Sequence, residues 1–96
     1  MISSSSIVVA SKEQVSCDLN GESVILNFKS GTYYGLNPVG SFIWNLIQNP
    51  KTVGQVEEAV LEHYEVDPNE CKRDLLELLS DLSENELVKI GDEADK

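Results

Sequence analysis

Covalent chemistry in this chain would have to come from one histidine, His63, and two cysteines, Cys17 and Cys71. A nucleophilic Cys–His pair also needs a third group that orients the base and a donor for the oxyanion, and the sequence marks neither. Two cysteines supply neither a disulfide framework nor a set of metal ligands. We therefore expect no catalytic residue, no metal and no cofactor, and two buried thiols in a reducing cytoplasm.

Charge and length limit the possible partners. Acidic residues number 17 and basic residues 7, a net charge of −10 that repels nucleic-acid phosphates and anionic membrane surfaces. The 96 residues suffice for one domain with a modest core. The N-terminus lacks the charged start of a secretory signal, and the apolar stretches are too short to span a membrane. We expect a cytoplasmic protein with neutral or basic partners, and no binding to nucleic acid or membrane.

Two turn signals, Asn20-Gly21 and Ser30-Gly31, separate three short strand-like segments and predict a meander of two tight hairpins. If each hairpin closes on its two-residue turn, the register of both follows. The first then pairs Leu19 with Glu22, Cys17 with Val24 and Val15 with Leu26, and the second pairs Lys29 with Thr32, Phe28 with Tyr33 and Leu26 with Gly35.

This register sorts the side chains onto two faces. An antiparallel sheet that is covered on one side by helices has one buried and one wet face. We expect the more apolar face to be buried, with Val15, Cys17, Leu19, Val24, Leu26, Phe28 and Tyr33. The wet face then carries Gln14, Ser16, Asp18, Ser23, Asn27, Lys29, Thr32 and Tyr34. Ile25 and Leu36 violate the pattern, because they are apolar residues on the wet face that the Ile7–Ala10 segment or a ligand would have to cover.

Three helices are predicted after the meander, and each has its own start signal. The first begins at Asn37-Pro38, a good N-cap followed by a first-turn proline, and the second at Thr52, whose capping box Gln55 completes. The third begins at Asp67-Pro68 and carries an apolar stripe as far as Leu82. Asn85 is expected to end it in the left-handed conformation, before a short extended segment over residues 87–90.

The centre of the chain carries a more specific pattern, Gly31-Thr32-Tyr33-Tyr34-Gly35-Leu36-Asn37-Pro38-Val39-Gly40 followed by Ile43-Trp44. The second half agrees through Tyr64, the Asp-Pro start of the third helix, and Leu78-Leu79, Leu82 and Leu87-Val88. Over residues 14–90 the sequence resembles the PqqD-like family of precursor-peptide recognition domains. Glu86 departs from that pattern, because relatives often carry glycine there.

The resemblance implies an α+β fold in which a three-stranded antiparallel β-meander is followed by three helices, a winged-helix-like arrangement. We expect residues 14–90 to form this domain, residues 1–13 an N-terminal extended segment and residues 91–96 a mobile acidic tail.

The resemblance also implies a function, that of a chaperone for the leader segment of a ribosomally made, post-translationally modified peptide. As a free-standing domain with Tyr-Tyr-Gly-Leu-Asn, the chain looks most like the discrete leader-binding proteins of lasso-peptide pathways. In those pathways, relatives hand the leader to a cysteine protease and assist an ATP-dependent cyclase. The coenzyme PQQ branch of the family is the close alternative.

The third strand offers a place for the leader. The middle strand is shielded on both sides, whereas the strand over residues 32–36 has a free edge, and an open edge is a template for another strand. Gly35 removes a side chain where a second backbone would approach, although it would also suit a simple bend. We expect the leader to bind along this edge, at the outward backbone groups of Tyr33 and Gly35, and in a groove against the third helix. The groove is expected to be lined by Tyr34, Leu36, Leu75, Leu76 and Leu79. The groove side of that helix could be provided by either Leu76 or Leu78.

Two other classes are compatible with such a fold. A winged-helix DNA-binding regulator needs a basic recognition helix, but the third helix follows Lys72 and Arg73 with Asp74, Glu77, Asp81 and Glu84. A protein-interaction subunit without a peptide substrate would be distinguished by a pull-down with precursor peptide. The acids of the second helix, Glu57, Glu58 and Glu62, fit a solvated face or a docking site for a basic patch on a partner enzyme.

Overall fold

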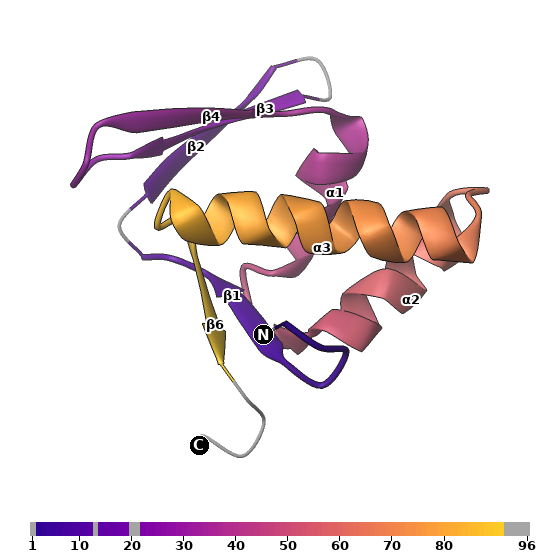
Figure 1. Ribbon diagram of the computed structural model, residues 1–96. Helices are drawn as coiled ribbons and strands as arrows, with labels where there is room; N and C mark the ends of the chain where they lie inside the picture. Colours follow the sequence, from indigo (N-terminus) through magenta and orange to yellow (C-terminus); the bar gives the residue numbers. More distant parts are fainter. Residues whose placement is uncertain (1, 13, 20–21, 92–96) are drawn as a thin grey trace.

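The computed structural model describes residues 2–12, 14–19 and 22–91. These residues form six strands, arranged in two antiparallel sheets, and three helices (Figure 1). The strands are β1 (Ile7–Ala10), β2 (Gln14–Leu19), β3 (Glu22–Asn27), β4 (Thr32–Leu36), β5 (Lys51–Thr52) and β6 (Val88–Gly91). The helices are α1 (Pro38–Leu46), α2 (Val53–His63) and α3 (Pro68–Glu84).

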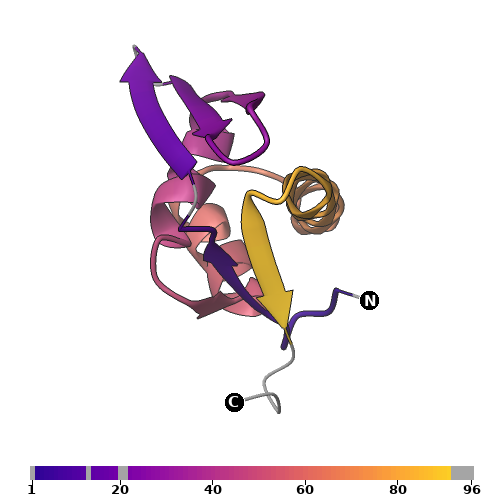
Figure 2. The same cartoon turned by 90° about the vertical axis from the view of Figure 1, so that its left-hand side faces the viewer.

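The predicted order, a three-stranded meander followed by three helices in an α+β fold, is confirmed. The meander has the strand order β2-β3-β4, so β4 lies at one edge. Helix α3 runs below the meander, roughly along β4 (Figure 1). Figure 2 shows α3 end-on, on the β4 side of the meander and away from β2. This placement puts an exposed sheet edge next to a long helix.

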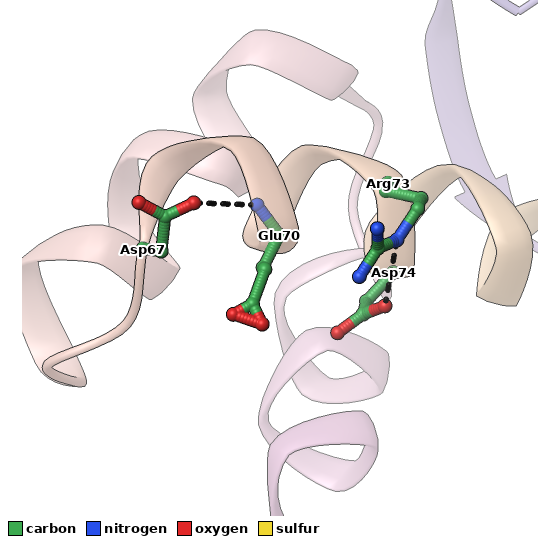
Figure 3. Close-up of polar contacts among 4 residues, drawn as sticks. All are labelled: Asp67, Glu70, Arg73 and Asp74. Carbon is green, nitrogen blue, oxygen red and sulfur yellow. Dashed lines mark hydrogen bonds and ion pairs between the residues drawn. The ribbon is translucent and has the colours of Figure 1, made fainter.

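Each helix begins where the sequence predicts. The side chain before each first turn accepts a hydrogen bond from a backbone N–H group that the helix itself leaves unsatisfied. In α2 the capping box is complete, because the Thr52 N–H also donates to Gln55 Oε1 at 2.9 Å. The caps are Asn37, Thr52 and Asp67, and they accept from Gly40, Gln55 and Glu70 at 2.8, 3.1 and 3.1 Å, the last of which Figure 3 shows.

Helix α1 starts immediately after β4, and Gly40 permits the close approach. A Cβ atom at Gly40 would lie 3.1 Å from Leu36 Cδ2, which is tighter than ordinary van der Waals contact. The first turn of α1 therefore packs directly on the last residue of β4. This fixes the direction in which the chain leaves the meander.

The first hairpin has the predicted register, with Leu19 opposite Glu22, Cys17 opposite Val24 and Val15 opposite Leu26. The second hairpin was predicted wrongly. The structure pairs Asn27 with Thr32, Leu26 with Tyr33 and Val24 with Gly35, so the connection is residues 28–31 rather than a two-residue turn. Because the partners of β4 shift by two residues, every side chain keeps the face that the sequence assigned to it.

The longer turn has a physical cause in Asn27. Its Oδ1 accepts from the backbone N–H groups of Lys29 and Ser30 at 3.0 and 3.2 Å, and its carbonyl accepts from the Gly31 N–H at 2.7 Å. Asparagine commonly stabilises a turn in this way. Gly31 has φ 76, a left-handed value that glycine adopts without steric cost.

The predicted polarity of the meander is also wrong, because the apolar face is the exposed one. Val15, Phe28 and Tyr33 are 57%, 58% and 71% exposed, and Cys17, predicted to be buried, is exposed as well. The residues that seemed to violate the pattern, Ile25 and Leu36, are buried at 0% and 5% exposure.

Two observations explain the reversal. Leu36 points to the face on which α1 packs, and α1 covers β3 as well as β4. Asn27 can be buried on that face because its Nδ2 donates to the carbonyls of Glu86 at 3.1 Å and Asn85 at 3.5 Å. A buried polar group whose hydrogen bonds are satisfied costs little. Counting apolar residues per face therefore gave the wrong side.

The second sheet, with the order β5-β1-β6, was not predicted. Residues 1–13 were expected only as an extended segment, whereas Ile7–Ala10 forms the central strand of this sheet. Val8 and Ala10 join the core, and the Ala10 N–H donates to the Ile47 carbonyl at 2.8 Å. The predicted extended segment after α3 is confirmed as β6. Residues 92–96 of the predicted tail and the first turn signal, residues 20–21, lie outside the described residues.

One core joins the two sheets and the helices. Its fully buried side chains come from α1, α2, α3 and both sheets, and they include Val8, Ile25, Trp44, Ile47, Val56, Leu79, Leu82 and Leu87. Among the described residues, no helix combines the length and the apolar character that crossing a membrane requires.

Helix α3 ends in a Schellman motif. The Glu86 N–H donates to the Ser83 carbonyl at 3.0 Å, and the Leu87 N–H donates to the Leu82 carbonyl at 2.9 Å. The left-handed residue is Glu86, with φ 58, and not Asn85 as predicted. The position at which relatives often carry glycine therefore keeps the conformation that favours glycine.

Replacing Glu86 by glycine should stabilise the fold. The left-handed conformation costs a residue with a Cβ atom about 1–2 kcal/mol, and glycine avoids this cost. Glycine also makes the unfolded chain more flexible, which offsets about 0.5–1 kcal/mol of the gain in stability. We expect Glu86→Gly to raise the free energy of unfolding by about 0.5–1 kcal/mol, measured by urea denaturation. Ser80→Gly, at an exposed position inside α3, is the matched control and should lower it by about 0.5 kcal/mol. An equal loss in both variants would contradict this prediction.

Candidate functional site

A groove of about 670 Å³ lies between β4 and α3. One wall is the end of β4 with the start of α1, and the other is the exposed side of α3. The two elements run in opposite directions (Figure 1), and Tyr34 in the middle of β4 contacts Asp81 near the end of α3. The groove volume lies in the range of roughly 300–1,000 Å³ that is usual for ligand sites.

The floor of the groove is apolar. Leu36, Ile43 and Leu75 are 5%, 4% and 2% exposed and form its deepest part, because they belong to the core as well. Leu78 is half-buried and Val66 is 43% exposed, so apolar surface also reaches the rim. An apolar side chain that entered the groove would meet this surface and lose its contact with water.

The structure brings together four of the seven residues predicted for this site. The lining includes Tyr34, Gly35, Leu36 and Leu75. Of the other three, Tyr33 lies on the opposite face of the meander, Leu79 is fully buried in the core and Leu76 is half-buried against the core.

The prediction left open whether Leu76 or Leu78 faces the groove, and Leu78 does. Sequence reasoning did not find the contributions of α1 and α2, which are Val39, Gly40, Ile43 and Val60. Ile43 and Val60 stand at apolar positions of amphipathic helices, and nothing in the sequence separates a core position of this kind from a groove floor.

The edge of β4 beside the groove is free, because no other described strand pairs with it. Its hydrogen-bonding pattern follows from the first hairpin. Leu19 and Glu22 form the hydrogen-bonded pair that closes that hairpin, so the backbone N–H and C=O groups of Glu22, Val24 and Leu26 point toward β2. The backbone groups of the alternate residues of β3 point toward β4 instead. Thr32 and Tyr34 face those alternate residues, so their N–H and C=O groups form hydrogen bonds with β3. The N–H and C=O groups of Tyr33 and Gly35 point outward, away from β3.

Gly35 is exposed within β4 and not at a bend, since the strand continues to Leu36. A Cβ atom added there would find no described atom within 4 Å. Because Gly35 lies opposite Val24, that Cβ atom would point to the outer face of the meander and not into the groove. Access to the outward backbone groups of β4 is thus open.

The groove has an acidic rim. Four exposed carboxylates of α3 line it at helical spacing, and we call these the acidic rail: Glu70, Asp74, Glu77 and Asp81. Glu65 and Asp67 extend the negative charge beyond the start of the helix. Among the described lining residues none is basic, so the groove combines an apolar floor with a negatively charged wall.

Tyr34 connects β4 to the acidic rail. Its hydroxyl donates to Asp81 Oδ2 at 3.5 Å. Partial burial raises the pKa of the Tyr34 phenol, and the negative charge of Asp81 raises this pKa further. The phenol is therefore held in its neutral, donating form.

Of the candidates for covalent chemistry, His63 makes its described contacts with aromatic rings. His63 stacks on Phe42, with ring centroids 4.6 Å apart, and Tyr64 meets its edge. Burial raises the pKa of the Cys71 thiol, and the charges of Glu57 and Asp74 raise it further, so this thiol has little of the thiolate that nucleophilic attack requires. In the described part of the chain, no three His, Cys, Asp or Glu side chains form a group that could hold a metal ion.

The fold and groove define a class of protein, one that presents a free sheet edge beside an apolar groove. The sequence profile described as coenzyme PQQ synthesis protein D (PqqD) matches residues 22–88, more than half of the chain. The chain belongs to the PqqD family. A comparison with the sequences of curated proteins gives no match.

Two solved structures resemble this one. The first is TbiB1 in complex with the TbiA(β) leader peptide, with a TM-score of 0.77 and 36% sequence identity, over 84% of this chain and 94% of that one. The second is a lasso peptide synthetase B1 complexed with the leader peptide, with a TM-score of 0.73, over 85% of this chain and 96% of that one. At 23% identity, the second likeness concerns the fold alone.

The contact between Tyr34 and Asp81 predicts a coupled titration. Because the folded-state pKa of Tyr34 is raised, folding favours the protonated phenol, and this contribution to stability is lost as the pH rises through the folded-state pKa. Asp81→Asn should lower the pKa of Tyr34, followed by the ultraviolet absorbance of the phenolate with Tyr34→Phe as the reference. Glu84→Gln removes a charge from the same end of α3 and is the control. An unchanged Tyr34 titration in Asp81→Asn would contradict the assignment.

Proposed function

We propose that this chain binds the leader segment of a ribosomally made, post-translationally modified peptide precursor, in a lasso-peptide pathway. The leader adds as a strand to the free edge of β4 and places apolar side chains in the groove against α3. The observation that carries the proposal is the open edge beside an apolar groove, in a fold shared with TbiB1, which was solved with a leader peptide.

Strand addition divides the binding free energy between backbone and side chains. The outward groups of Tyr33 and Gly35 provide hydrogen bonds that do not depend on the leader sequence. Alternate side chains of an added strand point to one face, so every second leader residue would enter the groove above Leu36 and Leu75. Each leucine-sized anchor buried there contributes about 1.5–3 kcal/mol. Micromolar affinity corresponds to about 8 kcal/mol, so anchors and backbone bonds are both required.

The residues proposed for contact with the leader are Tyr33 and Gly35 through their backbone groups, and Tyr34, Leu36, Leu75 and Leu78 through their side chains. Leu76 and Leu79 act indirectly in this proposal, because they pack in the core behind the groove.

The protein would act without catalysing a reaction, and would present the bound leader to a cysteine protease and an ATP-dependent cyclase. The separation of His63 from the groove and the raised pKa of the Cys71 thiol support a binding role. The exposed apolar face of the meander stays outside the groove, so leader binding leaves it accessible to an enzyme partner.

The family description favours a second candidate, a peptide chaperone of coenzyme PQQ synthesis. The same edge and groove would serve that role, and the likeness to TbiB1 at 36% identity favours the lasso pathway. A DNA-binding regulator is disfavoured, because the exposed side of α3 presents the acidic rail where phosphate contacts need basic residues.

Backbone amide exchange tests strand addition. On titration with the TbiA(β) leader peptide, exchange at Tyr33 and Gly35 should slow sharply, because their outward N–H groups gain partners. Exchange at Tyr34 should change little, because its N–H already bonds to β3. Amide-resolved hydrogen exchange by NMR makes the measurement, with a scrambled peptide of the same composition as the control. Saturable binding with unchanged exchange at Tyr33 and Gly35 would rule out addition at this edge.

Proline substitutions test the same geometry without exchange data. Gly35→Pro deletes an outward donor, so it should abolish leader binding and largely keep the fold. Tyr34→Pro deletes an inward donor of the hairpin and leaves its acceptor on β3 unpaired, so it should lower the free energy of unfolding by about 1–3 kcal/mol. Circular dichroism reports the fold and calorimetry reports binding. Full leader affinity in a folded Gly35→Pro variant would contradict the proposal.

The proposed division of labour predicts that the purified chain alone leaves a precursor intact, whereas adding it to the pathway protease accelerates cleavage of the leader. The acceleration should require the β4 edge and disappear in Gly35→Pro. The control is His63→Ala, an exposed position outside the groove lining, which should leave the acceleration intact. Cleavage by the isolated chain that is lost in Cys71→Ala or His63→Ala would show instead that the chain is an enzyme.

A further inference from the structure

The acidic rail and the free edge of β4 face the same groove. All four rail carboxylates belong to exposed residues, and Figure 3 shows the side chains of Glu70 and Asp74 projecting from the same side of α3. Arg73 lies 3.8 Å from Asp74, in an ion pair whose side chains are 69% and 75% exposed. Within the described residues it is the only salt bridge of the rail, so most of the negative charge lacks a cation of the chain itself.

The spacing of the rail matches an extended peptide. On an α-helix, residues four apart rise by about 6 Å, and the whole rail from Glu70 to Asp81 spans about 16 Å. In a strand, side chains on one face repeat about every 6.7 Å, so the first, third and fifth residues span about 13 Å. A strand added to β4 therefore presents three alternate side chains, all on one face, along the rail.

The groove is not uniform along this length. Along α3, Leu75 and Leu78 stand between Asp74 and Asp81, and Leu36 closes the opposite side; Val66 and Cys71 continue the apolar surface toward the start of the helix. Carboxylates flank this pair of leucines on both sides along the helix, with Glu70 and Asp74 before them and Asp81 after them. Long basic side chains can lay their methylene stems on apolar surface and hold the charge at its rim.

We propose that the groove selects a basic leader segment, in which an apolar residue is flanked at two residues on either side by lysine or arginine. The apolar side chain occupies the floor, and the two cations meet opposite ends of the acidic rail. The pattern is symmetric, so it holds for either strand direction. This inference rests on the proposed function and adds the chemical class of peptide that the groove accepts.

The magnitude of the effect follows from exposed ion pairs. Two such pairs at about 0.5 kcal/mol each sum to about 1 kcal/mol, which corresponds to about a fivefold change in Kd. The advantage depends on salt, because the screening length falls from about 10 Å at 0.1 M ionic strength to about 3 Å at 1 M. Apolar anchors and backbone bonds do not share this dependence.

A displayed library of short random peptides, selected on the full chain, tests the proposal. Three proteins are compared: the unchanged chain, the rail variant Glu70→Gln/Glu77→Gln/Asp81→Asn, and the control Glu58→Gln/Glu62→Gln/Glu84→Gln. The control removes the same charge from exposed positions outside the groove. The unchanged chain and the control should enrich lysine or arginine two residues from an apolar residue, and the rail variant should lose this enrichment. Replacing the two cations of an enriched peptide by glutamine should weaken Kd about fivefold at low salt, and less at high salt.

Two results would overturn the inference and leave the proposed function intact. One is enrichment of neutral apolar peptides that still need the β4 edge, and the other is equal enrichment of basic residues by the rail variant. A selection in which no peptide is enriched over the starting library would contradict the proposed function itself, and this inference with it.

Discussion

The side chain of Asn27 ties together the two elements that form the groove. Its Oδ1 organises the turn between β3 and β4, while its Nδ2 donates to carbonyls at the end of α3. The meander and the helix are thus fixed to each other at one end of the groove through one buried amide. At the other end, α1 follows β4 without a loop and packs on Leu36. With both ends fixed, the space between β4 and α3 stays open although no covalent link spans it.

The end of α3 belongs to the same arrangement. The nearer of the two carbonyls that accept from Asn27 is that of Glu86, the residue in the left-handed conformation of the Schellman motif. The helix must therefore end at this position for the amide to find its partner. Leu87, next in the chain, is fully buried and leads into β6. Helix termination, the position of β4 and the pairing of β6 with β1 are connected through three neighbouring residues.

Local signals made much of this fold predictable. Asn37, Thr52 and Asp67 mark the three helix starts correctly, because a cap is decided by a side chain and a backbone group three residues away. The register of the first hairpin could be predicted for the same reason, because it depends on a turn signal between neighbouring segments. The second register is wrong because Asn27, outside the recognised turn signal, sets the length of that turn.

The failures concern contacts between distant segments. Which face of the meander is buried depends on the bond between Asn27 and Glu86 and on where α1 lands, and neither is visible in the alternation of residues. Strand β1 pairs with β5 and β6, far from it in the sequence. At the site, the sequence allowed the free edge of β4 to be predicted, together with three lining residues, Tyr34, Leu36 and Leu75. Leu79 was assigned to the groove because the depth of the helix stripe was misjudged, since this residue is fully buried in the core.

An unpaired strand edge is also a hazard, because it can pair with the same edge of another molecule and start aggregation. Here the danger is increased by Phe28 and Tyr33, which extend exposed apolar surface next to that edge. The net charge of −10 opposes this self-association, since two copies repel each other as they approach. A short basic peptide meets no such repulsion and is drawn toward the same surface. Colloidal stability and ligand attraction thus have a common source in the excess of carboxylates. The same charge repels another copy of the protein and attracts a basic peptide, so the edge can stay open.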